Sequence, residues 1–575
     1  MPENAFLPTR LLDLGAEDKF DDIKLIQCSS LVPRRQIRYA TLSYCWGTKE
    51  QAAHQAKTTS LNLQQNMIGI SFETMTQVIK DAITTTKALS LRYLWVDALC
   101  IIQGDRHDWT RESAEMAHVY RHAFVTICTL TTFSCNDSFL DRDPAVNVHF
   151  RSTIRGEIQG VYSLRLQPRK TGSSRGWVGR AHRDRMFGNW AERAWTFQEE
   201  TLSPRILYFG SSRIHYKCGH ERWEEGYFDD DPIQVGGSLA ETLFQSDAVP
   251  SAESSYKTWL EVVGSYSNRE LTDKRDRLPA ISGLAKLVAS KVDDTYIAGI
   301  WAGDFLQGLL WRTFETEETV KRFNVGCENT NEYIGPTWSW VARAAANFTK
   351  LRTSKTLYDG GVTHLRSEWR SYNVSYTLED KDLNPYGRML DCKLSLEGKL
   401  AETNPCWGRI QCTSATNNPW EVRFNNNNYK AVCYLDGPQP EISHGVFHGT
   451  YLLLLASTVG GWPGYTCHTG TWDDMLWGYG VTRIFEWESD AEREVHEKLR
   501  SGTFDSFQIP EPGKYVKKPW ERDPAYERLD RNAWGIIVRQ IGDGTYIRQG
   551  LFEVHAEEGG LKAFESYPFQ QLEVH

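Results

Sequence analysis

The feature of this sequence that most constrains its fold is an alternation of strand-like and helix-like segments between residues 37 and 131. Three runs of strand length are apolar, aromatic or β-branched: IRYATLSYC (37–45), LRYLWVDALCII (91–102) and FVTICTL (124–130). Two helical patterns separate them: SFETMTQVIKDAITTTKAL (71–89), with Ser71 as its expected N-cap, and HDWTRESAEMAHVYRHA (107–123). Strands that are apolar on both faces and alternate with helices predict a parallel sheet with helices packed against it. We therefore expect an α/β fold here.

The rest of the chain predicts a change of structural class along the sequence. After a polar stretch with one expected strand, GVYSLRLQ (160–167), the segment WAERAWTFQEETL (190–202) predicts a helix and RILYFGSSRIHYKC (205–218) a hairpin. Helical patterns around Tyr256 and after Pro279 predict a helical middle section, and short alternating segments up to AWGIIVRQIGDGTYIRQGLFEV (533–554) predict a β-rich end. The expected divisions are a lead-in (1–36), an α/β domain (37–235), a helical accessory section (236–350) and a mostly β accessory region (351–575).

Composition argues against several classes of function. The 575 residues carry a formal charge of −9 and no long Lys/Arg run, so we expect no nucleic-acid partner. Twelve cysteines without a CxxC pair predict reduced thiols. The longest apolar runs are too short to span a bilayer and no signal-peptide pattern is present, so we expect a cytoplasmic protein without a membrane segment. Phosphate-loop, dinucleotide and serine-hydrolase fingerprints are missing as well.

The motif SYCWG (43–47) places a cysteine, a tryptophan and a glycine where the first strand must end. A nucleophilic thiol at Cys45 would need a basic partner, and no local pattern selects one of the 15 histidines. A metal site built from HYKCGH (215–220) matches no common zinc spacing, so we expect no metal. Burial as a small apolar residue is the more frequent role of a free cysteine. We therefore interpret Cys45 as part of a cleft wall.

Two strand ends predict one crevice. In an open parallel sheet, ligands lie beyond the carboxyl ends of the strands, and SYCWG and DALCIIQGD (97–105) are two such ends. Asp97 also interrupts an apolar run and needs a partner or a raised pKa. A ligand-binding role for Gly47 and Trp46 competes equally with a turn glycine and a core-capping indole. The candidate binding residues are Tyr44, Cys45, Trp46, Gly47, Asp97 and Gln103.

Two acidic residues stand out on the second expected helix. At about 100° per residue, Glu112 projects into the middle of the apolar stripe, whereas Glu115 falls at its edge. An acid on the buried face of a helix is a candidate catalytic group. Pairing of Glu112 with a buried arginine such as Arg193, which would only lock helices together, explains the pattern equally well.

Four ordered motifs carry a resemblance to a known family. TLSYCWG, LRYLWVDALCIIQ, DWTRESAEMAHVYRHA and RAWTFQEETLSPRILYF, in this order and at these distances, resemble the HET (heterokaryon incompatibility) domain of filamentous fungi. The resemblance covers residues 37–200. It implies a role in non-self recognition between fungal strains, with growth arrest or programmed cell death as the outcome. The partner it implies is an unknown protein or incompatibility determinant, and self-association into a homo-oligomer is compatible with it.

The HET domain is itself regarded as a distant relative of TIR domains, which have a flavodoxin-like sheet. That relation implies an NAD glycohydrolase, with NAD as substrate and no required cofactor. Glu112 or Glu115 would then correspond to the catalytic glutamate, and the face of the helix favours Glu112. A carboxylate near the ribose would stabilise the oxocarbenium-like state, while Trp46 stacks on a ring and Asp97 and Gln103 orient the site.

Two other interpretations stay open. The domain is a non-enzymatic signalling module that docks or self-associates, or the C-terminal β region is a recognition module that releases the HET domain. The RWTFQE motif contains Arg193, Trp195, Gln198 and Glu199, for which we favour a structural network.

Overall fold

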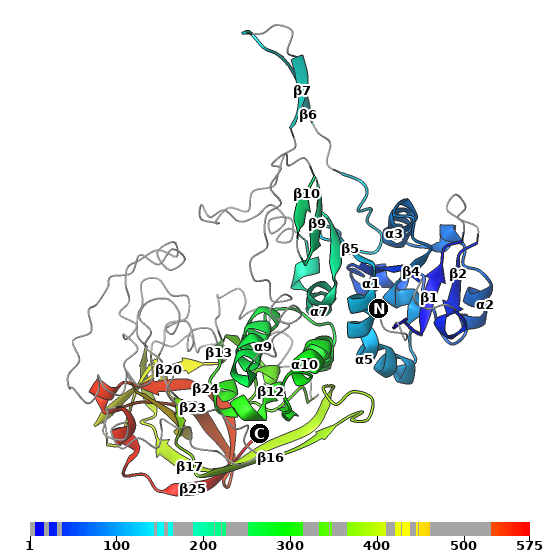
Figure 1. The fold of residues 1–575 in the computed structure, drawn as a ribbon. Coiled ribbons are helices and arrows are strands. Elements are labelled where there is room, and N and C mark those ends of the chain that lie inside the picture. The colour runs from blue at the N-terminus through cyan, green and yellow to red at the C-terminus, as the bar shows by residue number, and fades with distance from the viewer. Residues whose placement is uncertain are drawn as a thin grey trace.

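A computed structural model of the protein describes most, but not all, of the 575 residues. The described residues are 6–15, 22–31, 37–142, 146–154, 159–164, 188–211, 213–219, 221–225, 251–313, 333–343, 346–347, 365–409, 420–426, 428–436, 444–446, 448–459 and 531–575. They form an N-terminal sheet with flanking helices, a helical middle section and a strand-rich C-terminal region (Figure 1).

The N-terminal sheet has eight strands in the order β10-β9-β8-β5-β3-β4-β1-β2. The four central strands, β8, β5, β3 and β4, are parallel, and the strands at both edges are antiparallel. The sheet is therefore mixed, which corrects the expectation of a parallel sheet. The strands are β1 (Arg10–Asp13), β2 (Lys24–Gln27), β3 (Tyr39–Ser43), β4 (Tyr93–Trp95), β5 (Val125–Thr129), β8 (Arg205–Phe209), β9 (Ile214–Cys218) and β10 (Arg222–Glu224).

The segment before residue 37, which we expected to be a lead-in, supplies two of these strands. β1 pairs antiparallel with β4, and Leu11 and Leu12 on β1 are fully buried. The hairpin expected at 205–218 is confirmed as β8 and β9, closed by Gly210 N–H donating to the Arg213 carbonyl at 2.9 Å. The sheet therefore begins before the first motif and ends after the last one.

Helices cover both faces of this sheet, as the alternation predicted. Figure 1 shows α3 and α5 on opposite sides of β1 and β4. Tyr39 on β3 donates to the Val119 carbonyl of α5 at 2.7 Å, and Trp95 on β4 packs edge-on against Tyr120 of the same helix. The helices are α1 (Lys49–Ala53), α2 (Leu63–Ile68), α3 (Gln77–Ala88), α4 (Asp97–Cys100), α5 (Arg106–His122) and α7 (Ala194–Leu202).

Two local expectations were wrong. The helix expected from Ser71 begins at Gln77, because extended backbone at Met75 and Thr76 separates it from one 3₁₀ turn at Phe72–Thr74. The apolar run 91–102 is not one strand: β4 ends at Trp95, and Asp97 begins the short helix α4. Periodicity cannot distinguish a buried strand from a buried helix within a continuous apolar run, so the boundary at Trp95 was not predictable.

The middle section consists of helices and short hairpins, as expected. α9 (Ala252–Tyr266) and α10 (Ser282–Ala289) confirm the two predicted helices, and α11 (Phe305–Leu309) follows them. Two small sheets pair β11 (Tyr296–Ile297) with β12 (Ile300–Trp301), and β13 (Arg312–Thr313) with β14 (Ala346–Asn347). One cluster of buried apolar side chains runs from Leu11 through this section to Val574, so the described parts share a core.

The C-terminal region forms an eleven-stranded sheet that closes on itself. β22 pairs with β17 and β23, β24 pairs with β23 and β25, and β25 pairs with β17, which makes a ring of five strands. The hairpin predicted at 533–554 is confirmed as β23 and β24. The strands are β15 (Leu365–Ser367), β16 (Ser371–Leu378), β17 (Met389–Glu402), β18 (Cys406–Arg409), β19 (Trp420–Phe424), β20 (Tyr429–Leu435), β21 (His444–Val446), β22 (Thr450–Val459), β23 (Arg531–Gly542), β24 (Thr545–Val554) and β25 (Phe569–Val574).

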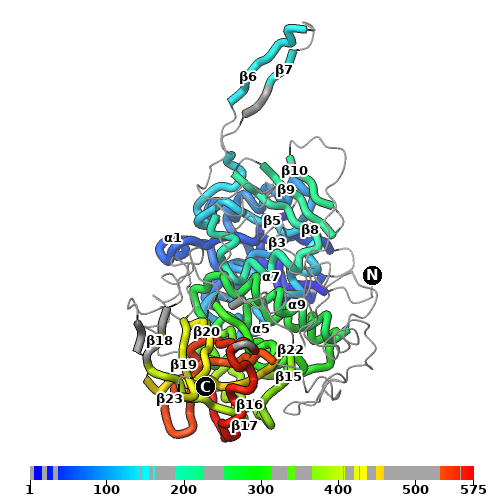
Figure 2. Tube along the Cα trace, turned by 90° about the vertical axis from the view of Figure 1, so that its left-hand side faces the viewer, coloured from blue at the N-terminus to red at the C-terminus, as the bar shows by residue number. Residues whose placement is uncertain are grey.

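Two hairpins extend from these bodies. β6 (Val146–Arg151) and β7 (Gln159–Leu164), which includes part of an expected strand, stand away from the rest of the described chain (Figures 1 and 2). The β16–β17 hairpin instead reaches the N-terminal domain. Arg106 of α5 pairs with Glu379, and the Arg388 guanidinium lies 4.8 Å from the ring centre of Trp109. The C-terminal region therefore contacts the first turns of α5.

Candidate functional site

The two turns predicted to border one crevice do meet. β3 and β4 are parallel neighbours in register at Thr41 and Trp95, so their carboxyl ends lie at the same edge of the sheet. Trp46 Nε1 donates to Asp97 Oδ2 at 3.0 Å. Gln103 Nε2 donates to the Asp97 carbonyl at 3.1 Å and to the Ile101 carbonyl at 3.1 Å. Trp46, Asp97 and Gln103 are therefore brought together.

Tyr44 and Cys45 of the first turn are packed inside the protein. Tyr44 is buried, and its hydroxyl accepts from Gln55 Nε2. Cys45 is buried in a small cluster with Cys128 and Trp190, and burial raises the pKa of its thiol. A thiol with a raised pKa is a poor nucleophile at neutral pH, so the environment of Cys45 favours the wall interpretation.

Gly47 is required by the turn itself. Its φ is +90°, and an added Cβ would lie 2.4 Å from Gln51 Oε1 and 2.7 Å from Ser134 Cβ. Glycine reaches this backbone conformation without the steric penalty that other residues have. The turn-glycine interpretation therefore accounts for Gly47 without a ligand.

The helix α7 brings a second acid and a base to the same edge. Arg193 Nη1 donates to the Tyr44 carbonyl, and Ser43, the last residue of β3, donates to Glu199 Oε2. Trp190 Nε1 donates to Ser43 Oγ at 2.8 Å. We call Ser43, Tyr44, Trp46, Asp97, Arg193 and Glu199 the strand-exit cluster.

The strand-exit cluster holds more acid than base. Burial raises the pKa of Glu199 to about 7, although the Ser43 hydroxyl and Arg193 oppose the shift, and Asp97 adds to it. Burial also raises the pKa of Asp97, opposed by Arg193 and by the donors Ala98 N–H, Trp46 and Tyr44. The charge of Arg193 thus opposes the rise in the pKa of two carboxyl groups, Asp97 and Glu199, and the pKa of Glu199 is still near neutral. A carboxyl group with such a pKa can exchange a proton with a ligand at neutral pH.

The opposite side of α7 holds the middle section. Gln198 Oε1 accepts from Gly283 N–H at 2.9 Å, and Thr196 Oγ1 accepts from Arg269 Nη1 at 2.9 Å. Trp195 packs edge-on against Trp109 at 6.3 Å between ring centres. The structural interpretation of the motif therefore fits Trp195 and Gln198. Arg193 and Glu199, for which the same structural role was expected, instead contact Tyr44 and Ser43 at the strand exits.

The acids of α5 lie in different surroundings. Glu112 is only 3% exposed, and Arg111 Nε donates to its Oε1 at 3.1 Å while Arg10 Nη2 lies 3.5 Å away. Its arginine partners are thus Arg10 and Arg111. Within the described residues, no hydrogen bond or ion pair joins Glu112 to Trp46 or Asp97. Glu115 is partly exposed at the edge of the stripe, as expected.

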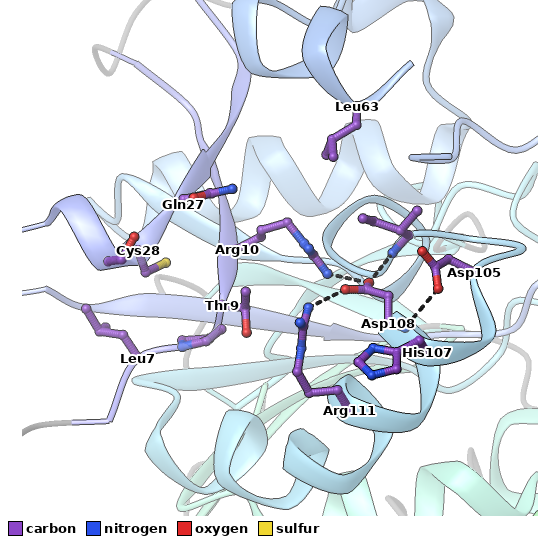
Figure 3. Close-up of a pocket in the computed structure, with 13 residues that line it drawn as sticks. Leu7, Thr9, Arg10, Gln27, Cys28, Leu63, Asp105, His107, Asp108 and Arg111 are labelled. Carbon is purple, nitrogen blue, oxygen red and sulfur yellow. Dashed lines mark hydrogen bonds and ion pairs between the residues drawn. The ribbon is translucent and has the colours of Figure 1, made fainter. Parts of the chain in front are cut away.

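A cavity of about 590 Å³ is lined by Arg10 and Arg111, the two arginine partners of Glu112, and we call it the α5 pocket. Figure 3 shows Arg10 and Arg111 pointing toward Asp108, with Asp105 and His107 beside it. Arg10 Nη2 donates to Asp108 Oδ2 at 2.5 Å, and Ile102 N–H donates to the same oxygen at 2.8 Å. The pocket is lined by Leu7, Pro8, Thr9, Arg10, Gln27, Cys28, Ser29, Leu63, Ile102, Asp105, His107, Asp108 and Arg111.

The helix α4 separates the two sites. It begins at Asp97 in the strand-exit cluster, and the carbonyl of its last residue, Cys100, accepts from Arg10 Nε at 2.6 Å. Arg10 and Asp108 were not predicted as site residues, although Asp105 and Asp108 have the spacing of an N-cap and an acidic first turn. In the ranges that the structure describes, no three His, Cys, Asp or Glu side chains gather as a metal site would require.

The fold and these two sites define a class: an α/β domain with buried charges at the carboxyl ends of its parallel strands, joined to helical and β-rich parts. Residues 39–199 match the family model described as Heterokaryon incompatibility protein (HET). The chain therefore carries a HET domain, as the motifs predicted. No curated protein and no solved structure matches the chain. None of the described helices is both long enough and apolar enough to cross a membrane.

Proposed function

We propose that this chain acts in heterokaryon incompatibility, where it takes part in non-self recognition between fungal strains and causes growth arrest or cell death. The match of residues 39–199 to the HET family model carries the proposal. Three of the four motifs that suggested the family also meet in space, because the β3 turn, α4 and α7 all contribute to the strand-exit cluster. The expected partner is an unknown protein or incompatibility determinant, and the expected localisation of the chain is the cytoplasm.

We further propose that the domain cleaves the nicotinamide–ribose bond of NAD at the strand exits. The parallel strands have the order β4-β3-β5-β8, which is the order expected of a flavodoxin-like sheet, and such sheets bind ligands at the carboxyl ends of their strands. Bond cleavage develops positive charge on the ribose, which a fixed carboxylate stabilises. The Trp46 ring is partly exposed beside Asp97 and can stack on a flat group.

Asp97 is the carboxylate that the geometry favours for this step. It lies at the strand exits and no described arginine forms an ion pair with it, whereas two arginines neutralise Glu112. The catalytic role of Glu112 that the TIR resemblance implies would require those pairs to open. Glu115 lies near Lys286 of α10, and Lys286 belongs to neither site.

Nicotinamide release from NAD by the purified full chain tests the step. We expect Asp97→Asn to lower the rate by about 100-fold, Glu112→Gln by less than 10-fold, and Glu115→Gln, the matched control, not at all. Circular dichroism verifies that each variant is folded. A large loss in Glu112→Gln with Asp97→Asn unaffected would move the catalytic carboxylate to α5. No release by the wild type would remove the enzymatic step but not the role in incompatibility.

A non-enzymatic module controlled by the C-terminal region is the second candidate. It is favoured by the contacts of the β16–β17 hairpin with α5, through Arg106–Glu379 and Arg388 over Trp109. Induced expression in a filamentous fungus separates the two candidates. If chemistry kills the cell, Asp97→Asn restores growth at equal protein level. Growth arrest that persists in Asp97→Asn supports the non-enzymatic module, and normal growth with wild-type protein contradicts both.

A further inference from the structure

The α5 pocket is built from buried charged side chains that the strand-exit cluster does not use. Arg10 is 4% exposed and Asp108 5% exposed, and both line the cavity. The walls come from separate parts of the chain: β1, the end of β2, α2, the loop after α4 and the first turns of α5. Residues that are far apart in the sequence therefore meet at one cavity.

Three of the four carboxylate oxygens of Asp105 and Asp108, which line this pocket, accept hydrogen bonds from the protein. Asp108 Oδ2 accepts from Arg10 and from Ile102 N–H, and Asp108 Oδ1 accepts from Arg111. Asp105 Oδ1 accepts from Asp108 N–H at 3.0 Å as the N-cap of α5. Ligand groups that donate hydrogen bonds or carry positive charge therefore find few open acceptors here.

Two arginine side chains of the pocket, by contrast, keep N–H groups that can donate hydrogen bonds to a ligand. The hydrogen bonds of Arg10 use Nε and Nη2, and those of Arg111 also use Nε and Nη2. Among the described residues, Nη1 of neither arginine has a hydrogen-bond partner. His107 adds an exposed imidazole in the first turn of α5, where the helix dipole favours negative charge.

This arrangement selects for an anion with several acceptor oxygens. The donors come from β1, from the first turn of α5 and from its second turn, so they approach from different directions. A phosphate group offers three peripheral oxygens to such a set, whereas a carboxylate offers two in one plane. Leu7, Leu63 and Ile102 supply an apolar wall, and about 590 Å³ is ample for a small molecule.

We propose that the α5 pocket binds the phosphate group of a small phosphorylated molecule of nucleotide size, whose apolar part lies against Leu7 and Leu63. Arg111 and His107 contact the phosphate from α5, and Arg10 contacts it from β1. The site lies at the other end of α4 from Asp97 and is independent of the proposed NAD cleavage.

Calorimetric titration of the full chain with AMP, adenosine and inorganic phosphate tests the site. We expect AMP to bind at least 10-fold more tightly than adenosine, and inorganic phosphate to compete with AMP. Arg111→Gln should weaken AMP binding at least 10-fold and His107→Gln about 3-fold. Arg121→Gln is the matched control, since this exposed residue lies at the far end of the same helix, and it should leave AMP binding unchanged.

Three results would overturn the proposal. Equal binding of AMP and adenosine would exclude phosphate recognition, and no AMP binding at millimolar concentration would exclude the ligand class. AMP binding that weakens in Asp97→Asn but not in His107→Gln or Arg111→Gln would place AMP at the strand exits. Because AMP lacks the nicotinamide–ribose bond, these results are separate from those of the nicotinamide-release assay.

Discussion

The two buried charge clusters at the ends of α4 differ in their balance. Beside the α5 pocket, Arg10 and Arg111 face Asp108 and Glu112, so two bases serve two acids. In the strand-exit cluster, Arg193 is the one arginine and its charge opposes the rise in the pKa of two acids, Asp97 and Glu199. Similar residues at one sheet edge thus differ in their balance of acids and bases, although burial raises the pKa of Glu112 as well.

The difference shows how charge balance separates structural from reactive groups. A balanced buried cluster holds its elements together, because removing one charge leaves another unpaired. In an unbalanced cluster fewer cations oppose the effect of burial on the pKa of the acids, and the pKa of Glu199 rises to about 7. Perturbed acids of this kind are typical of functional sites. The strand-exit cluster is therefore the better candidate for chemistry, and the α5 pocket the better candidate for binding.

The largest expected effect comes from breaking the balanced cluster. Arg10→Met removes the cation that Asp108 and Glu112 share, and leaves Arg111, which is 44% exposed, as their remaining basic partner. Loss of one member of a buried ion pair costs about 3–5 kcal/mol. We expect the free energy of unfolding, measured by urea titration at pH 7, to fall by about that amount.

The control is a surface pair of the same chemistry. Arg370 pairs with Glu397 at 3.0 Å, with side chains 61% and 32% exposed. Arg370→Gln should cost less than about 1 kcal/mol. Equal losses in the two variants would mean that the cluster around Arg10 is solvated and does not lock β1 to α5.

The next largest effect is a pH dependence of stability caused by Glu199 in the strand-exit cluster. Burial raises the pKa of Glu199 from its ordinary value of 4.5 to about 7. The folded state therefore binds this proton more tightly than the unfolded state, and stability is highest below about pH 4.5 and is lost as pH rises through about 7. The full contribution is about 3 kcal/mol.

Glu199→Gln keeps the shape of the neutral form and removes the proton equilibrium. We expect urea titrations between pH 5 and pH 8 to show wild-type stability falling by up to about 3 kcal/mol relative to Glu199→Gln. Glu192→Gln, an exposed acid next to α7, should follow the wild type. Parallel pH profiles of wild type and Glu199→Gln would show that Glu199 ionises normally and that the two clusters do not differ as described.

The sequence predicted the α/β alternation, the helical middle section and the final hairpin, because each depends on local periodicity and turn residues. It also predicted that the turns that carry Trp46 and Asp97 would lie together, because neighbouring parallel strands end at one edge. The strand β1 was not predictable, since RLLD is too short to show a period. Residues that pair across long distances, such as Arg10 with Asp108, leave no local pattern.

The same limit applies to the RWTFQE motif. Its helical character could be read from the sequence, but which of Gln198 and Glu199 faces the strand exits depends on how α7 lies between the sheet and α10. Gly283 decides this contact: an added Cβ would lie 2.2 Å from Ala117 Cβ and 2.6 Å from Gln198 Oε1. A glycine 85 residues after Gln198 gives no sign of that role in the sequence.

The smallest expected effect isolates the link between the two strand exits. Trp46→Phe keeps an aromatic ring but removes the 3.0 Å hydrogen bond to Asp97 Oδ2, which opposes the rise in the pKa of that carboxyl. The pKa of Asp97 should therefore rise further, which costs stability only where Asp97 is ionised in the unfolded chain. We expect a loss of about 1 kcal/mol at pH 7 in urea titration and a smaller loss at pH 4.

Trp223→Phe on β10, where the ring is 54% exposed, is the matched control and should change stability by less than about 0.5 kcal/mol. A loss in Trp46→Phe that is equal at both pH values would come from packing of the indole, and the strand exits would then be joined by shape rather than by charge.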